Sequence, residues 1–223
     1  MRAELTREIT EAARRQLATE GAAGLSLRAV ARELGMVSSA VYRYFPSRDD
    51  LLTALIIDGY NALGEAVEQA DAACPRAGYL ARWLACCRAV RDWALAHPHE
   101  YALVYGSPVP GYRAPEQTIA PASRAAAVLG AIISEAHAAG VLAPPDSGPP
   151  LPGSFGPDAA RLRDSVLAGV PDEVVARALA SWASLFGLVS FELFGQFENG
   201  VTDRAAYFDY SAACLGRLAT LPA

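Results

Sequence analysis

The residues of this sequence best suited to chemistry lie close together, between Ser38 and Arg43. Ser38 and Ser39 offer short hydroxyl groups. Tyr42 adds an aromatic ring with a polar tip, and Arg43 adds a planar guanidinium. Such groups hydrogen-bond the phosphate oxygens of nucleic acid, and arginine also binds the edge of guanine. On a short helix they share one face, opposite Val41, and this face is expected to contact DNA.

Two helices joined by a tight turn are expected to position this face. Ser26 is a suitable N-cap for the first helix, whose apolar residues, such as Val30, recur at helical spacing. Gly35 ends that helix, because glycine adopts positive φ without a clash at the Cβ position. The second helix is expected to begin at Ser38 or Ser39, either of which can cap it.

Helices before and after this pair are expected to complete a compact unit. Residues 3 to 20 form an amphipathic helix, whose apolar stripe is expected to pack against Phe45. The next helix is expected over residues 47 to 72, because Ser47 and Asp50 match a capping box. This helix runs on into the rest of the chain, so we interpret it as the mechanical link between the two parts.

Residues 26 to 52 resemble the helix-turn-helix signature of the tetracycline-repressor (TetR) family. The matches are the Val30–Ala31 pair, Gly35 in the turn, hydroxyl residues opening the second helix, the Tyr42–Phe45 end and the Pro46–Arg48 start of the next helix. The resemblance implies a transcriptional regulator that binds a palindromic double-stranded DNA operator as a homodimer, and we expect a repressor.

The predicted DNA contacts follow from the helix face and from this resemblance. Tyr42 and Arg43 are expected in the major groove and Arg48 at phosphate, whereas Arg28 is placed only by analogy with the fold. The full predicted set is Ser26, Arg28, Ser38, Ser39, Ala40, Tyr42, Arg43, Tyr44 and Arg48.

The charge distribution limits the kind of DNA binding. The net charge is −5, but residues 1 to 62 carry eight arginines and eight acidic residues, so that part is neutral. This neutral charge excludes a protein that coats DNA non-specifically by neutralising many phosphates. It does not exclude a compact domain that binds a specific DNA sequence through a few arginines. The sequence contains no lysine, so every phosphate contact from a basic side chain would be a guanidinium fork.

The rest of the chain is expected to be a helical body. Helices are predicted over residues 79–96, 100–105, 117–139, 158–168, 171–197 and 203–218, with irregular connections at 106–115 and 141–157. The predicted helix 171–197 is apolar nearly all round, so a large core or a partner chain must cover it. Together with the last helix it would form a four-helix interface between two copies, as the resemblance also implies. The predicted interface residues are Trp182, Val189, Leu193, Phe208 and Leu215.

Trp182, Phe186 and Gly187 resemble the core of the WHG-type C-terminal domain of the TetR family. Aromatic residues with polar tips suit a pocket for an apolar small-molecule effector, although they could equally be ordinary core residues. The predicted pocket residues are Trp83, Cys87, Trp93, Tyr101, Tyr105, Trp182 and Phe186.

The sequence therefore predicts an all-α protein with a helix-turn-helix DNA-binding domain at residues 1–46, a connecting helix at 47–72 and a ligand-binding and dimerisation domain at 73–223. We expect a cytoplasmic, ligand-responsive regulator without enzymatic activity, cofactor, metal or membrane span. Two alternatives stay open. One is a redox-sensing regulator that uses Cys86 and Cys87, and the other is a helical enzyme or carrier whose DNA-binding part is vestigial.

Overall fold

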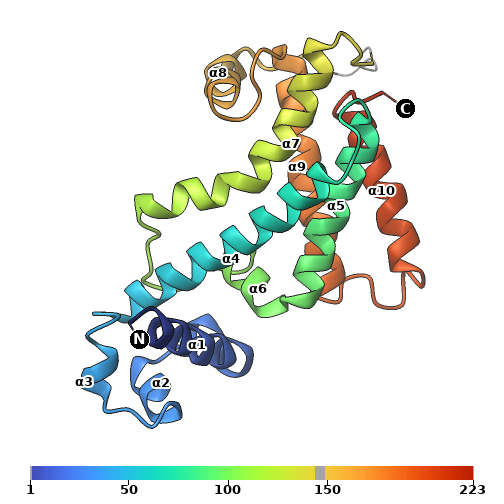
Figure 1. The fold of residues 1–223 in the computed structure, drawn as a ribbon. Coiled ribbons are helices and arrows are strands. Elements are labelled where there is room, and N and C mark those ends of the chain that lie inside the picture. Colours follow the sequence, from blue (N-terminus) through green and yellow to red (C-terminus); the bar gives the residue numbers. More distant parts are fainter. Residues whose placement is uncertain (1, 144–148, 223) are drawn as a thin grey trace. The chain divides into compact units, whose positions relative to one another are not determined.

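The computed structural model describes residues 2–143 and 149–222, and every regular element in this part of the chain is a helix, as predicted (Figure 1). Part of the predicted connection at 141–157 lies outside the described residues. The helices are α1 (Arg2–Gly24), α2 (Leu27–Glu33), α3 (Ser38–Val41), α4 (Arg48–Ala72), α5 (Tyr79–Ala96), α6 (Pro98–Tyr105), α7 (Ile119–Ala138), α8 (Gly156–Ser165), α9 (Asp172–Leu193) and α10 (Arg204–Leu218), with short 3₁₀ turns at Glu116–Thr118 and Gly153–Phe155.

The chain forms two compact units whose boundaries differ from the predicted ones. The head unit contains Met1–Ala62 and Ala96–Ala122, and the body unit contains Leu63–Leu95 and Ser123–Ala223. Helix α4 therefore belongs partly to each unit, and α6 with the loop after it belongs to the head. The sequence did not indicate this, because Leu103, Val109 and Tyr112 sit in a loop-rich stretch that lacks the head's regular periodicity, yet all three pack on the head's core.

The head is built around one apolar core. The stripe of α1 meets the inner faces of α2, α3 and the start of α4, and Ile9, Val30 and Val41 are fully buried there. Ser26 accepts a hydrogen bond from the Ala29 backbone N–H at 3.4 Å, which confirms it as the N-cap of α2. Gly35 has a φ of 65° and ends that helix as predicted.

Helix α3 begins at Ser38, as predicted, but its cap differs from the prediction. Val37 is its N-cap, and neither Ser38 nor Ser39 caps the helix, because Ser38 is already its first helical residue. Only one turn is regular. The chain then tightens, with the Tyr44 backbone N–H bonded to the Val41 carbonyl at 2.9 Å.

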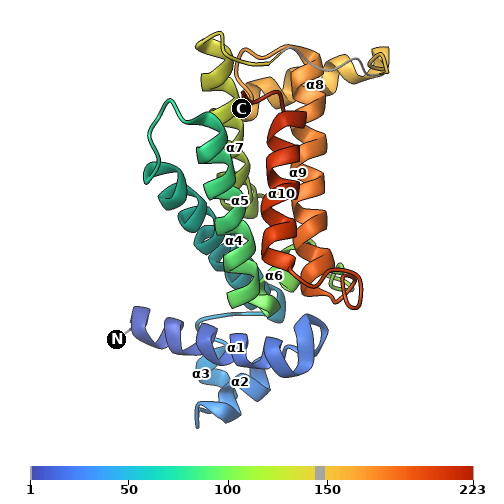
Figure 2. The same cartoon turned by 90° about the vertical axis from the view of Figure 1, so that its right-hand side faces the viewer.

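In the body, α9 and α10 lie side by side (Figure 2). The indole N–H of Trp83, on α5, donates to the Ala212 carbonyl of α10 at 2.9 Å. Gly216 lies at the same contact, where an added Cβ would come within 2.8 Å of Leu80. A larger residue at position 216 would therefore have to displace Leu80 or the Trp83 ring. Helix α9 ends at Leu193, earlier than predicted, and Gly195, with a φ of 77°, follows its last turn.

A buried arginine joins three elements of the body. Arg82 on α5 has no exposed surface and binds Asp71 of α4 at 2.7 Å and Glu135 of α7 at 2.6 Å. Arg76 bonds the same two carboxylates, both at 2.6 Å. Burial alone would raise the pKa of Asp71, but the hydrogen bonds from Arg82 and Arg76 outweigh it and hold that pKa below its usual value. The cluster fixes the end of α4 against α5 and α7.

Two helical segments, Glu116–Ala138 and Asp172–Leu193, are long and apolar enough to cross a membrane by length and composition alone. Of the apolar windows in these two segments, 33% and 39% are buried inside the chain, so its own core covers less than half of either window.

Breaking the buried ion cluster should destabilise the body. Arg82→Met leaves Asp71 and Glu135 with only the more exposed Arg76 as partner and should cost roughly 1.5 to 3 kcal/mol of unfolding free energy, measured by urea denaturation. Arg88→Met on the same helix is the control. It removes a pair with Asp209 in which the side chains are 50% and 45% exposed, and it should cost less than about 1 kcal/mol. Equal costs for the two variants would contradict this role of Arg82.

Candidate nucleic-acid interface and ligand cavity

The helix-turn-helix exposes one polar face above its core. Val41 is fully buried and Phe45 is 7% exposed, so the other side of α3 and its final turn faces solvent. Ser39, Tyr42 and Arg43 are exposed on that side. This is the face that the sequence predicted.

Two exposed arginines extend the face. Arg28 on α2 and Arg43 have no acidic side chain within ion-pair distance in the described part of the chain. Their guanidinium groups are therefore available to phosphate or to a base edge, and arginine forms paired hydrogen bonds with both.

The other predicted contacts are less accessible. Ser38, Ala40 and Tyr44 are half-buried, and Tyr44 packs on the head's core with its ring 5.9 Å from the Arg2 guanidinium carbon. The Ser26 hydroxyl is already used as the cap of α2. These residues border the exposed face.

The geometry does not support Arg48 as a phosphate contact. Its guanidinium turns back to the end of α1 and donates to the carbonyls of Ala22, Ala23 and Leu25 at 2.7, 3.1 and 3.2 Å. Carbonyls at a helix end lack partners within the helix, and a cation there also suits the helix dipole. Arg48 therefore holds α1 against α4. Sequence spacing could not reveal this, because the partners lie more than twenty residues away.

Val37 is not among the DNA contacts predicted from the sequence. It lies in the turn before α3 and is 71% exposed, the most exposed large apolar side chain in the described chain. An apolar side chain at this position can contact the methyl group of thymine. The sequence contained one indication of this exposure, which is that Val37 is apolar although it lies in the turn between two helices.

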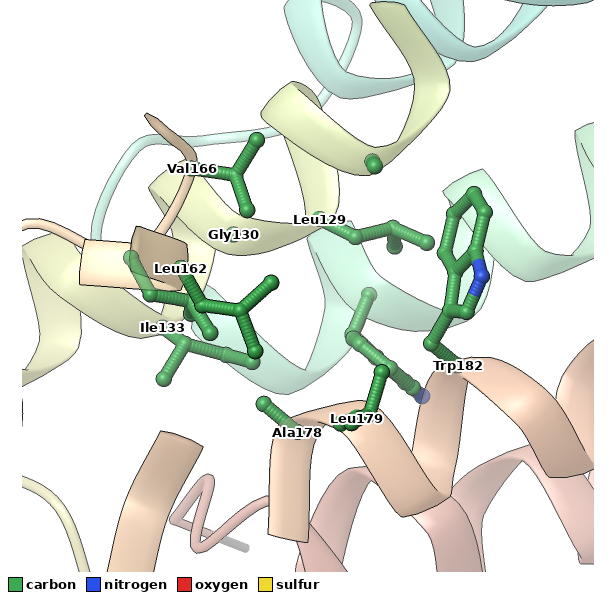
Figure 3. Close-up of a pocket in the computed structure, with 11 residues that line it drawn as sticks. Leu129, Gly130, Ile133, Leu162, Val166, Ala178, Leu179 and Trp182 are labelled. Carbon is green, nitrogen blue, oxygen red and sulfur yellow. The ribbon is translucent and has the colours of Figure 1, made fainter. Parts of the chain in front are cut away.

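The body contains a cavity of about 120 Å³ (Figure 3). Side chains converge on it from α5, α7, α8 with the segment after it, and α9. Its lining residues are Trp83, Ala126, Leu129, Gly130, Ile133, Leu162, Val166, Leu167, Ala178, Leu179 and Trp182.

Only two of the predicted pocket residues, Trp83 and Trp182, line this cavity. Phe186 stacks on Trp182, with ring centroids 4.4 Å apart, but stands outside it. Trp93 and Cys87 are buried elsewhere in the body.

Tyr101 and Tyr105 lie in the head, where they form an aromatic cluster. Their ring centroids are 5.2 Å apart, and Tyr105 contacts Tyr60 edge to face at 5.9 Å. The prediction failed for these two because aromatic content does not reveal which core a side chain joins.

The vicinal cysteines are poor redox groups. Both are fully buried, and burial raises the pKa of the Cys86 thiol to about 12 and that of Cys87 well above its usual value. Because the thiolate is the reactive form, these thiols are inert at neutral pH, and the redox alternative loses its support. In the described residues no group of three or more His, Cys, Asp or Glu side chains could hold a metal ion.

The predicted dimer residues divide into two groups. Val189 and Phe208 are 1% and 3% exposed within their own chain, so their prediction as interface residues is corrected: they are core residues. Trp182, Leu193 and Leu215 are half-buried. The outer face of α9 and α10 instead presents larger exposed side chains, which are Leu179, Phe191, Tyr207, Tyr210 and Leu218.

Comparison with known proteins agrees with this architecture. The sequence model described as bacterial regulatory proteins of the tetR family matches residues 9–55, and the one described as a tetracyclin repressor-like C-terminal domain matches residues 83–215. This chain belongs to the TetR family of transcriptional regulators. The TetR resemblance seen in the sequence is thereby confirmed.

Relatives extend over nearly the whole chain. The HTH-type transcriptional regulator Rv1816 of Mycobacterium tuberculosis is 42% identical over 210 residues, which cover 93% of this chain and 89% of that protein. The crystal structure of regulatory protein SCO4313 is 35% identical with a TM-score of 0.77, covering 96% of both chains. A Rhodococcus sp. RHA1 protein of unknown function is 27% identical with a TM-score of 0.69, covering 96% of this chain and 93% of that one.

The TetR assignment makes the chain a DNA-binding transcriptional regulator. It also accounts for the two apolar helical segments, which are helices of a soluble regulator rather than of a membrane protein.

Arg43 and Arg48 should differ sharply when substituted. Arg43→Ala should cost roughly 1 to 3 kcal/mol of operator affinity and relax base preference at one position per half-site, with no change in melting temperature. Arg48→Ala should lower the melting temperature, because three carbonyls at the end of α1 lose a charged donor. Calorimetry and binding to specific and random DNA measure both effects. An unchanged melting temperature for Arg48→Ala, with a lower salt slope, would restore it as a phosphate contact.

Proposed function

We propose that this TetR-family protein is a cytoplasmic, ligand-responsive repressor that binds a palindromic operator as a homodimer and catalyses no reaction. The observation that carries the DNA-binding part is the exposed face of α3 above a fully buried core. Arg28, Arg43 and Tyr42 on and beside it have the chemistry to contact phosphate and base edges. Because the head has no excess of positive charge, binding must depend on these placed groups rather than on general attraction.

Selection of bound fragments from a random DNA pool tests this proposal. We expect an inverted repeat, because a two-fold dimer places two equal heads on two half-sites. Recovery of unrelated sequences, with no motif after several rounds, would rule out a sequence-specific operator.

The dimer proposal is supported by the outer face of α9. Small residues follow this helix at helical spacing: Ala180, Ala183 and Ser184 are exposed and Gly187 is half-buried. A Cβ added at Gly187 would meet nothing within 4 Å, so the chain's own packing does not require glycine there. Glycine inside a helix costs roughly 0.5 to 1 kcal/mol relative to alanine. Close approach of a helix from a second copy explains why that cost is tolerated.

Gly187→Arg should convert the dimer to a monomer without unfolding it. The new side chain meets open space in its own chain but would place bulk and charge between two subunits. Ala127→Arg, on the exposed side of α7, is the matched control. Sedimentation and light scattering report the mass of each variant. If Gly187→Arg stays dimeric, the partner helix does not pack at this position.

The ligand response is supported by the way the chain crosses between the units. Helix α4 and helix α7 each begin in the head and continue in the body. Within the body, Arg124 of α7 binds Glu68 of α4 through two hydrogen bonds of 2.8 and 2.7 Å. The turns of α7 that follow Arg124 line the cavity. A ligand that moves α7 therefore acts on the two helices that begin in the head and continue in the body.

A ligand that stabilises the body should weaken operator binding by the same factor by which operator DNA weakens ligand binding. A coupling of roughly 1 to 3 kcal/mol corresponds to a 5- to 150-fold change in operator affinity. Titrations of the ligand with and without operator, and of operator with and without ligand, measure the two factors. Ligands of several chemical classes that stabilise the protein but leave operator affinity unchanged would show that the cavity is uncoupled from the head.

A further inference from the structure

The chemistry of the cavity lining limits what it can hold. Its residues are aliphatic apart from Trp83 and Trp182, and none carries a charge. The indole N–H of Trp83 is already bonded to the Ala212 carbonyl. Trp182 carries the other side-chain donor of the lining, and its indole N–H bonds none of the described residues.

The size of the cavity limits the occupant further. At about 120 Å³ it is slightly smaller than the engineered cavity of roughly 150 Å³ that binds benzene or xenon in another protein. There is room for one aromatic ring or a short branched alkyl group. Leu179 is 42% exposed in the single chain, and the half-buried Trp182 lies next to it in Figure 3, so this end of the cavity lies beside the outer face of α9.

Gly130 gives the cavity its closed wall. A Cβ at this position would lie 2.0 Å from the carbonyl oxygen of Val166, in the segment that follows α8. Only glycine therefore allows this segment to close on α7. Glycine in the middle of a helix is destabilising relative to alanine, so Gly130 is explained by the close packing at the cavity wall and not by helix formation.

From these observations we infer that the cavity binds a small, uncharged, largely apolar molecule the size of one aromatic ring, with a single acceptor that meets the Trp182 indole N–H. The inference rests on the proposed ligand response and names the class of ligand. A charged molecule would lose its hydration without meeting an opposite charge. A sugar or other polyhydroxylated molecule would leave most of its hydroxyls unpaired against aliphatic walls.

Four one-ring probes test the inference on the full-length protein. Toluene is neutral, acetophenone adds one carbonyl acceptor, and benzoate and benzylammonium carry opposite charges. Calorimetric melting and the Trp182 indole N–H signal in a ¹⁵N spectrum report binding, with Trp182→Phe identifying that signal. We expect toluene and acetophenone to raise the melting temperature, acetophenone to bind more tightly and shift the Trp182 signal, and the charged probes to have no effect.

Two variants of α7 show where the probes bind. Ala126→Leu adds a side chain at the cavity wall and should weaken the neutral probes at least tenfold, whereas Ala127→Leu, the same change at an exposed position, should not. Trp182→Phe should make acetophenone bind no more tightly than toluene. This variant also keeps the test valid if Ala126→Leu folds poorly. Undiminished binding by Ala126→Leu, or equal binding of charged and neutral probes, would overturn the inference.

The two proposals can fail separately. If no neutral probe binds a protein that still retards its selected operator, the ligand class is wrong and the DNA-binding function stands. If the neutral probes bind as expected to a protein that selects no DNA motif, the ligand class stands and the operator proposal falls.

Discussion

The DNA-facing surface depends on the burial of Val41 and Phe45 beneath α3. This helix has one regular turn, and isolated helices shorter than about 12 residues are marginal in water. Its position therefore comes from tertiary packing, in which each large apolar side chain contributes roughly 1.5 to 3 kcal/mol on full burial. Because these two side chains face the core, Ser39, Tyr42 and Arg43 have to face outward.

The same dependence on packing applies to the helices around α3. Arg48 holds the end of α1 through three carbonyls, and α6 adds further contacts to the core from the middle of the chain. The head is thus assembled from two separate stretches of sequence. In the body, α7 has two roles. Arg124 binds Glu68 of α4 and Glu135 binds Arg82 of α5, while other side chains of α7 line the cavity. A change at the cavity therefore acts on an element that is already tied to α4.

Local signals in the sequence predicted the helix-turn-helix well. The Ser26 cap, the positive φ of Gly35 and the inward Val41 depend on residues within a few positions, so the sequence contains them directly. The capping residue of α3 was missed, because Val37 supplies the cap geometry without a side-chain hydrogen bond.

Long-range features could not be predicted in the same way. Periodicity identifies an apolar face but not the surface that covers it, so Val189 and Phe208 were assigned to a partner chain although their own core buries them. Tyr101 was assigned to the ligand pocket for a similar reason, although it belongs to the head. The cavity wall formed by Gly130 and Val166 depends on two segments that meet only in the folded chain.

Amide hydrogen exchange of the full-length protein, with and without its selected operator, tests the central claim most directly. If α3 contacts the DNA bases while the core beneath it holds it in place, the operator should increase the protection of the backbone amides at Val37 to Tyr44 and around Arg28. The protection of the α1 amides that face the core should not change. Non-specific DNA at the same concentration should give little protection at α3. Protection confined to the body, or equal protection by both DNAs, would contradict the account.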